Sequence, residues 1–323
     1  MKRAVRYGIA VLLAVLVMSC SAGAAEKTLI GVSIPTADHG FTGGVIWWAN
    51  KAIENCKKTY ADVDFLLITS DSATKQVGDI EDMMVKGVHA IVIFPHESGP
   101  LTPVMKKARD SGIFCTILDR GLTDESIQNM YVAGDNPGMG RVSAEWLGKE
   151  LGGKGEIVVI EGIPCVLNSE RVDNFNAVMK EKYPDIKILD SQPGHWNTQK
   201  ALEVMENYLQ KYPKIDAVWC QDDDMLKGVL QAYKESGRKD VKILLGGAGA
   251  KEIIKMIMDG DSLVRADVTY PPMLVATGIN ATASAMHGKN YSGFYMNASR
   301  IILQADLITK DNAASYYEPE SIF

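Results

Sequence analysis

Short, almost continuous apolar runs alternate with longer amphipathic stretches along most of this chain. In the first part, strands are predicted at 29–34, 65–69, 90–94, 113–118 and 131–133, and helices at about 41–60, 77–86 and 101–110. A second series has predicted strands at 157–160, 186–189, 217–220 and 241–245, and predicted helices at 170–183, 198–211 and 225–236. Apolar strands separated by amphipathic helices are typical of parallel sheets covered on both faces. Two such series predict an α/β fold with two doubly wound, Rossmann-like lobes.

The lobe boundaries follow from the elements that the first series lacks for a complete sheet. Residues 26–133 do not complete a first sheet, and 271–298 hold one helical pattern that could be added to it. The predicted N-terminal lobe is therefore 26–133 plus 270–298, and the predicted C-terminal lobe is 134–269 plus 299–323. The chain would cross between the lobes three times, near 133–134, 268–269 and 299–300, so that three segments form the hinge.

The first 25 residues have the pattern of a secretory signal peptide. A basic start is followed by an apolar run at 7–18 and by small residues at 19–25. The run is shorter than the roughly 20 apolar residues that cross a bilayer. We expect export to the periplasm, where nucleotide cofactors are not supplied, and hence no cofactor. Two outcomes stay open: cleavage at 22–25 that releases a soluble protein, and lipidation of Cys20, which lies in a loose lipobox.

Charge and cysteine content narrow the function further. Removal of the leader's three basic residues takes the formal net charge from −6 to −9, which argues against a nucleic-acid partner and against docking on anionic lipid. The remaining cysteines are Cys56, Cys115, Cys165 and Cys220. Their spacing does not indicate a metal site. Buried free thiols are expected, and Cys165 with Cys220 is the one pairing that stays open.

Candidate chemistry lies just after the predicted strands, because ligands of open parallel sheets bind outside the carboxyl ends of the strands. The segments at these ends are 38–41, 95–97, 119–120, 135–136, 165–171, 195–196, 221–224 and 267–270. They are rich in carboxylates, arginines and aromatic rings, and poor in lysine. Carboxylates and guanidinium groups can hydrogen-bond vicinal hydroxyls, and rings stack on apolar C–H faces. This composition indicates a sugar or polyol ligand.

Several of these stretches together resemble the type I periplasmic binding proteins, in the ribose/galactose branch that serves ABC importers. The stretches are 34–41, TILDR at 116–120, AGDN at 133–136, SQP at 191–193 before His195-Trp196, CQDDDM at 220–225 and ADLITKDN at 305–312. The resemblance covers nearly all of the chain after the leader. It implies a non-catalytic monomer that closes two lobes on its ligand and is recognised by a membrane permease. A ligand-presenting sensor for a chemoreceptor or histidine kinase is the alternative.

The resemblance also implies roles for individual residues. Asp119 and Arg120 match a pair that grips ring hydroxyls, Arg171 matches an arginine after the first strand of the second lobe, and Asp222 matches a hydrogen-bonding position. Phe41 and Trp196 match aromatic residues that sandwich the sugar ring. Ala248 stands where the family often has an aspartate, and Thr269 where a glutamine is common, with Asp267 two residues earlier. The full predicted ligand-binding set is His39, Phe41, Asp119, Arg120, Arg171, Trp196, Asp222, Asp267 and Thr269.

Two further predictions depend on the acidic residues. Asp223 or Asp224 is expected to cap the helix that begins near Met225, with Asp222 pointing into the cleft. A secreted sugar hydrolase using Asp119 and Asp222 would need two carboxyl groups about 5 to 9.5 Å apart, which the sequence does not show. There is also no GxSxG, no HExxH and no P-loop lysine after the glycines at 246–249. We therefore predict a binding protein and not an enzyme.

Overall fold

The computed structural model describes residues 27–287 and 300–323. The predicted signal peptide, its Cys20 and the third predicted crossing at Ser299 lie outside these residues. The first sheet has six parallel strands, in the order β11-β5-β4-β3-β1-β2. Its strands are β11 (Arg300–Leu303), β5 (Met130–Gly134), β4 (Phe114–Leu118), β3 (Ala90–Ile93), β1 (Thr28–Pro35) and β2 (Val63–Ser70).

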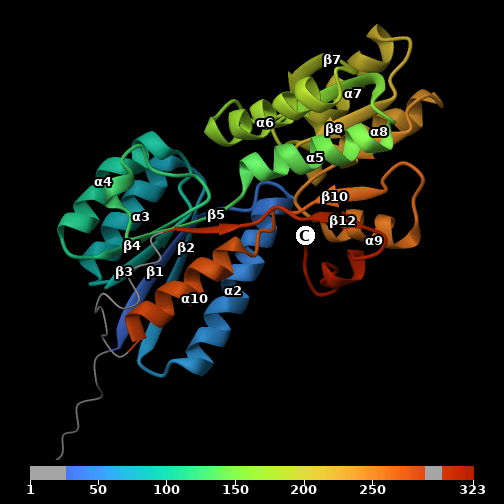
Figure 1. The fold of residues 1–323 in the computed structure, drawn as a ribbon. Helices are drawn as coiled ribbons and strands as arrows, with labels where there is room; N and C mark the ends of the chain where they lie inside the picture. Colours follow the sequence, from blue (N-terminus) through green and yellow to red (C-terminus); the bar gives the residue numbers. More distant parts are fainter. Residues whose placement is uncertain (1–26, 288–299) are drawn as a thin grey trace, which may run out of the picture.

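Helices cover both faces of this first sheet. As Figure 1 shows, one pair lies on one face and the other pair on the opposite face. The first pair is α2 (Gly40–Thr59) and α10 (Leu274–Met286), and the second is α3 (Ala73–Val85) and α4 (Ser98–Asp110). The central strands β3 and β4 are buried along their whole length, as the continuous apolar runs predicted.

The second sheet has four parallel strands, in the order β7-β6-β8-β9. Its strands are β7 (Asp185–Pro193), β6 (Lys154–Glu161), β8 (Ala217–Cys220) and β9 (Ile243–Leu245). Two helix pairs pack with it, α5 (Asn136–Glu150) on α6 (Val166–Lys182) and α7 (Thr198–Lys211) on α8 (Asp223–Ser236). An antiparallel pair, β10 (Ala266–Val268) and β12 (Leu307–Thr309), lies near α9 (Lys251–Asp259). The sequence had predicted neither α5 nor α9.

Capping residues explain where several of these helices begin and end. Asp135 directly precedes α5, and its Oδ1 accepts a hydrogen bond from the Gly138 N–H at 2.7 Å. Asn197 directly precedes α7, and its Oδ1 accepts a hydrogen bond from the Lys200 N–H at 2.9 Å. Helix α8 stops at Gly237, whose φ of +68° is a left-handed conformation that glycine adopts without a steric penalty.

The chain passes between the two sheets at three places (Figure 1). It leaves the first sheet after β5, returns to it after β10 to form α10, and leaves again between β11 and β12. The last passage differs from the sequence-based boundary, which placed 299–323 in the C-terminal lobe. Strand β11 pairs with β5, and the Asp135 N–H donates to the Leu303 carbonyl at 2.9 Å. The sequence of the short, partly exposed strand β11 did not indicate which sheet it joins, because its pairing with β5 is a contact between residues far apart in the chain.

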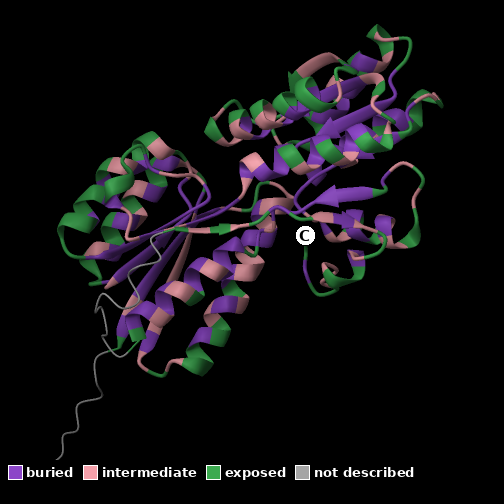
Figure 2. Ribbon diagram, viewed as in Figure 1, coloured by how far each residue is buried: buried purple, intermediate pink, exposed green. Residues whose placement is uncertain are grey.

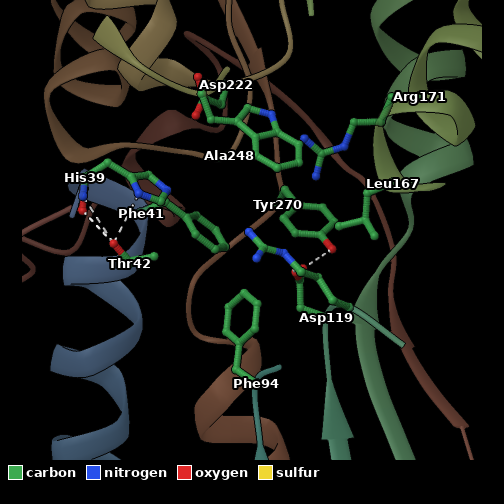
Figure 3. Close-up of a pocket in the computed structure, with 12 residues that line it drawn as sticks. His39, Phe41, Thr42, Phe94, Asp119, Leu167, Arg171, Asp222, Ala248 and Tyr270 are labelled. Carbon is green, nitrogen blue, oxygen red and sulfur yellow. Dashed lines mark hydrogen bonds and ion pairs between the residues drawn. The ribbon is translucent and has the colours of Figure 1, made fainter. Parts of the chain in front are cut away.

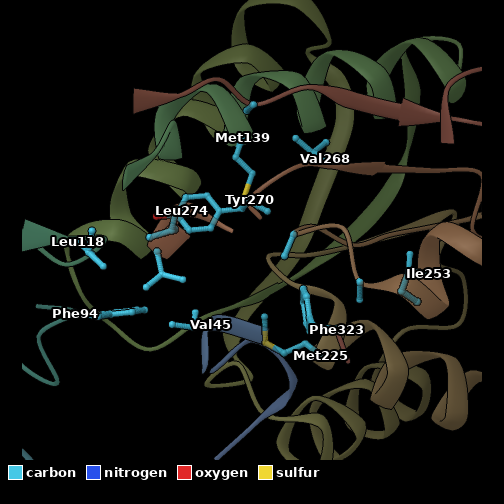
Figure 4. Packing of buried hydrophobic residues seen from close by; sticks show 14 of the residues in the cluster. Val45, Phe94, Leu118, Met139, Met225, Ile253, Val268, Tyr270, Leu274 and Phe323 are labelled. Atoms are coloured by element: carbon cyan, nitrogen blue, oxygen red, sulfur yellow. The ribbon is translucent and has the colours of Figure 1, made fainter. Parts of the chain in front are cut away.

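Buried apolar residues fill the space inside each layer and also the region where the two sheets approach each other (Figure 2). Figure 4 shows this second region, where Tyr270, Leu274 and Met139 lie close to Leu118 and Phe94. One cluster of buried apolar residues therefore connects the two lobes near the ends of their strands. The four described cysteines carry free thiols, Cys165 and Cys220 included. Within 27–287 and 300–323, no helix has the length and apolarity to cross a membrane.

Candidate functional site

A cavity lies between the two lobes at the carboxyl ends of their strands (Figure 3). It holds about 430 Å³ of space not filled by protein atoms, part of it open to solvent. The residues that line it are His39, Phe41, Thr42, Phe94, Asp119, Arg120, Leu167, Arg171, Trp196, Asp222, Ala248 and Tyr270. Seven of the nine residues predicted from the sequence are therefore brought together in one place.

The N-terminal lobe contributes an acid and a guanidinium group from the turn after β4. Asp119 is 3% exposed and has φ +58°, a left-handed conformation that aspartate tolerates better than most residues. The Tyr270 hydroxyl donates to Asp119 Oδ1 at 2.6 Å, and Asp119 Oδ2 lies 4.0 Å from Arg120 Nε. Arg120 Nη1 donates to the His96 carbonyl at 2.6 Å. Both charged side chains are thus held in place without a ligand.

The C-terminal lobe contributes a second guanidinium group, that of Arg171 on α6, which is 4% exposed. Its Nε donates to Asn136 Oδ1 at 2.8 Å and its Nη1 donates to the Gln221 carbonyl at 3.2 Å. The guanidinium carbon lies 4.4 Å from the centroid of the Tyr270 ring, a distance at which a cation–π interaction is favourable. These contacts fix the direction in which the remaining N–H groups point.

Aromatic rings form the walls of the cavity. Trp196 follows His195, and both have positive φ, at +54° and +59°. The indole packs on Gly162, where any side chain would overlap it. The indole Nε1 is buried and has no hydrogen-bond partner among the described residues. Phe94 directly follows β3, and its ring centroid lies 5.6 Å from the guanidinium carbon of Arg120. The ring centroid of Trp196 lies 6.0 Å from the same carbon.

At the start of α2 the cavity wall is built from local hydrogen bonds. His39 Nδ1 is 2.5 Å from Asp38 Oδ1, and the Thr42 hydroxyl donates to the same carboxylate oxygen at 2.8 Å. The His39 ring stacks on Phe41 with centroids 6.3 Å apart. Phe41 thus faces the cavity beside His39, as the sequence predicted.

Asp222 lines the cavity and also caps α8, because its Oδ1 accepts from the Met225 N–H at 2.9 Å. The prediction that Asp223 or Asp224 would be the cap is wrong, since β8 ends two residues before Asp222 and α8 begins directly after it, which places Asp222 at the position before the helix. Burial, with a smaller contribution from the nearby Asp224 carboxylate, raises the pKa of Asp222 to about 7.

Asp267, by contrast, does not reach the cavity. It is fully buried, and its Oδ2 accepts from the Gly249 N–H at 2.9 Å. Asp223 Oδ2 accepts from the same N–H at 3.1 Å, so two carboxyl groups converge on one donor. Burial raises the pKa of both carboxyl groups, that of Asp267 to about 6.

Thr269 is also outside the cavity. Its hydroxyl accepts from the Asp306 N–H at 2.8 Å, and its own N–H donates to the Asp306 carbonyl at 2.9 Å. It therefore joins the second and third passages of the chain. The next residue, Tyr270, lies in the cavity wall where Thr269 was expected, because neighbouring residues of an extended segment point in opposite directions.

Five residues of the lining are absent from the predicted set: Thr42, Phe94, Leu167, Ala248 and Tyr270. Leu167 and Tyr270 belong to strand-end segments that the sequence had marked, and Phe94 ends a predicted strand. The position after a strand was a usable signal for these three. Ala248 was recognised as the replacement of a family aspartate, and Thr42 gave no signal of its own.

Comparisons with known proteins agree with this architecture. The family model described as a periplasmic binding protein domain matches residues 30–290. The ribose import binding protein of Bacillus subtilis is 28% identical over 83% of this chain and 85% of its own length. The D-apiose import binding protein of Paraburkholderia graminis is 27% identical over 97% of each chain. A solute-binding protein of an ABC transporter from Actinobacillus succinogenes, solved with bound D-allose, has a TM-score of 0.77 and 26% identity over 90% of this chain and all of that one.

Two parallel-sheet lobes with a polar and aromatic cavity at their strand ends define the class of extracytoplasmic solute-binding proteins. The chain belongs to the periplasmic binding protein family. Members of this class bind their solute without chemical change, and its sugar-binding members work with the membrane permeases of ABC importers. The prediction of a binding protein of the sugar-importer type, and not an enzyme, is confirmed.

Proposed function

We propose that this protein captures a neutral sugar or polyol in the cavity between its lobes and delivers it to the permease of an ABC importer. The observation that carries the proposal is the pairing of two acids with two guanidinium groups between aromatic walls. Asp119 and Asp222 accept hydrogen bonds from hydroxyls, Arg120 and Arg171 donate to them, and Trp196 offers a flat apolar face. The relatives that bind or import ribose, D-apiose and D-allose support the same ligand class.

The charges of the lining favour a neutral ligand over an anion. Of the aspartates in the segments after the predicted strands, Asp119 and Asp222 line the cavity. Asp119 lies beside Arg120, whereas Asp222 is partly protonated near neutral pH because burial raises its pKa to about 7. No lysine belongs to the described lining. The guanidinium groups of Arg120 and Arg171 already donate to backbone carbonyls, and an anionic ligand would also approach the Asp119 carboxylate. A buried charge without sufficient counter-charge costs several kcal/mol.

A thermal-shift screen of pentoses, hexoses, deoxysugars, polyols and sugar phosphates tests this proposal. A ligand present at 100 times its Kd stabilises the folded protein by about 2.7 kcal/mol. We expect a shift with at least one neutral sugar or polyol, and calorimetry then gives its Kd. Micromolar binding of a sugar phosphate, with no response to any neutral compound, would overturn the proposal.

We propose that residues 1–25 direct export and are then removed. The basic start, apolar run and small-residue end support this assignment, as does a family that works outside the cytoplasm. The mass of the mature chain distinguishes the two forms that the leader allows. A chain starting at residue 25 or 26 indicates a released protein, and a lipidated chain starting at Cys20 indicates a membrane-anchored one. An unprocessed chain in the cytoplasm would contradict the assignment.

A further inference from the structure

The first turn of α2 donates a hydrogen bond to the opposite lobe. Asp224 belongs to the first turn of α8 in the C-terminal lobe, and its Oδ2 accepts from the Phe41 N–H at 3.1 Å. Asp224 is 5% exposed and is not part of the cavity lining. Lys227, one turn further along α8, lies 3.4 Å from Asp224 Oδ1. The carboxylate is therefore held by its own lobe and directed at the other.

The atom that Asp224 contacts is one that a helix leaves without a partner. The first four N–H groups of an α-helix have no intrahelical acceptor, and they carry a partial positive charge. A side-chain oxygen that accepts from such a group stabilises the helix by about 0.5–2 kcal/mol. In α2 the residue whose N–H is bonded is Phe41, whose ring lines the cavity.

Gly40 makes this approach possible. A Cβ at residue 40 would lie 2.6 Å from Asp224 Oδ1 and 2.9 Å from Oδ2, closer than carbon and oxygen atoms can approach. Gly43, in the same turn of α2, would place a Cβ no nearer than 3.5 Å to any neighbour. The clearance at Gly40 therefore serves the contact with Asp224, and Gly43 offers a matched control position.

The Phe41 ring receives a second contact from the C-terminal segment. Phe323 meets it edge to face, with centroids 5.8 Å apart and planes at 88°. This segment is attached to the C-terminal lobe, because Lys251 of α9 donates to the Ser321 carbonyl. Asp224 of the C-terminal lobe thus contacts the backbone of Phe41, and the C-terminal segment contacts its ring.

We infer that Asp224 is an affinity-determining positioning residue of this binding site. Its bond to the Phe41 N–H connects the two lobes, stabilises the closed arrangement and fixes the Phe41 ring in the cavity wall. Asp224 acts through Phe41 and makes no contact with the ligand. The inference rests on the proposed function, because it assumes that the ligand is enclosed between the two lobes.

The test uses Asp224→Ala, Asp224→Asn, Gly40→Ala, the double variant Asp224→Ala/Gly40→Ala, and Gly43→Ala as control. Calorimetry with D-ribose and D-allose measures Kd, and amide hydrogen exchange without sugar measures protection of the Phe41 N–H. We expect Asp224→Ala and Gly40→Ala each to weaken binding about 2- to 30-fold, the equivalent of a lost cap, and to remove the protection. Asp224→Asn keeps an oxygen acceptor and should retain part of both.

The double variant distinguishes loss of the Asp224 contact from a non-specific effect of the substitutions on the fold. Once the carboxylate is gone, the methyl group added at position 40 has nothing to overlap, so the double variant should bind as Asp224→Ala alone does. Unchanged Kd and unchanged Phe41 protection in Asp224→Ala and Gly40→Ala would overturn the inference, as would equal losses in Gly43→Ala. If the wild-type protein binds neither sugar, the choice of ligand fails, and Phe41 protection still decides whether the contact exists in solution.

Discussion

Asp222 combines two roles in one carboxyl group. It caps α8 through the Met225 N–H, and the same side chain lines the cavity. Because the group is buried, and because Asp224 follows in the same turn, its pKa is raised to about 7. A carboxyl group that is protonated about half the time near neutral pH can both donate to and accept from a ligand hydroxyl.

The raised pKa predicts a pH dependence of stability. An unfolded aspartate titrates near 3.9, so the folded protein binds the Asp222 proton more tightly, and its stability falls as pH rises from about 4 to about 7. The Asp222→Asn variant keeps an oxygen for the cap but has no proton to lose. Urea unfolding should therefore show Asp222→Asn gaining on the order of 2–3 kcal/mol relative to wild type between pH 5 and pH 8. An equal difference at both pH values would contradict the raised pKa.

Trp196 is the second residue with a testable role at this scale. Trp196→Ala should weaken binding of a neutral sugar by about 2–4 kcal/mol, because the stacked apolar face and its buried area are lost. Trp47→Ala is a suitable control, since that indole lies on α2 against Trp48 and Lys51 and is not part of the lining. Calorimetry giving one Kd for wild type and Trp196→Ala would exclude stacking.

At the scale of elements, the loop between β9 and α9 is held mainly by a side chain from α8, with a further hydrogen bond to Asp267 of β10. The Asp223 carboxyl group accepts from the N–H groups of Gly247, Gly249 and Ala250, at 3.0, 3.1 and 2.6 Å. The loop contains Ala248 with φ +100°, an unfavourable conformation for a residue with a Cβ. Asp223 therefore holds Ala248 at the cavity wall by compensating for a strained backbone.

Asp223→Ala should destabilise the protein by about 2–4 kcal/mol, because the N–H groups of Gly247 and Ala250 lose their acceptor. The Gly249 N–H keeps Asp267 as an acceptor. Urea unfolding measures the change. Glu181→Ala, at an exposed position of α6, should stay within about 0.5 kcal/mol of wild type. Equal stability of Asp223→Ala and Glu181→Ala would mean that solvent replaces the carboxyl group and that the loop does not depend on it.

At the scale of the whole molecule, two passages of the chain meet at Tyr270. This residue follows the second passage, and a side chain on Gly134, at the first passage, would overlap its ring. The same ring contacts Arg171 of the C-terminal lobe, and its hydroxyl contacts Asp119 of the N-terminal lobe. The relative position of the lobes is therefore linked to the polar groups of the cavity.

Gly134→Ala should displace Tyr270 and break its hydrogen bond to Asp119. We expect a loss of about 1–3 kcal/mol in the free energy of unfolding from overpacking, together with weaker binding of a neutral sugar. Gly121→Ala is the matched control, because a Cβ there would lie 3.9 Å from the nearest atom, an ordinary contact. Loss of stability with unchanged Kd would show that Tyr270 can move without altering the cavity.

The sequence alone determined the architecture and most of the cavity. Buried parallel strands must be apolar along their length, so β3 and β4 were visible as continuous runs, and the carboxyl ends of the predicted strands marked Phe41, Asp119, Arg120, Arg171, Trp196 and Asp222. These positions are local properties of the chain, because each lies in the segment that follows one predicted strand. The composition of the segments after the strands indicated the ligand class, and the family resemblance, which rests on short stretches at those ends, added the importer role and the roles of individual residues.

Only the tertiary structure decided which neighbour at a strand end faces the cavity and where the chain changes lobes. Tyr270 and not Thr269 faces inward, Asp222 and not Asp223 caps α8, and β11 joins the first sheet. Each outcome depends on contacts between residues far apart in sequence: Tyr270 with Asp119, Asp223 with the loop at 246–250, and β11 with β5. A local pattern shows that neighbouring side chains of an element point to opposite sides. Which of the two sides faces the cavity depends on contacts with distant residues, which form only in the folded chain.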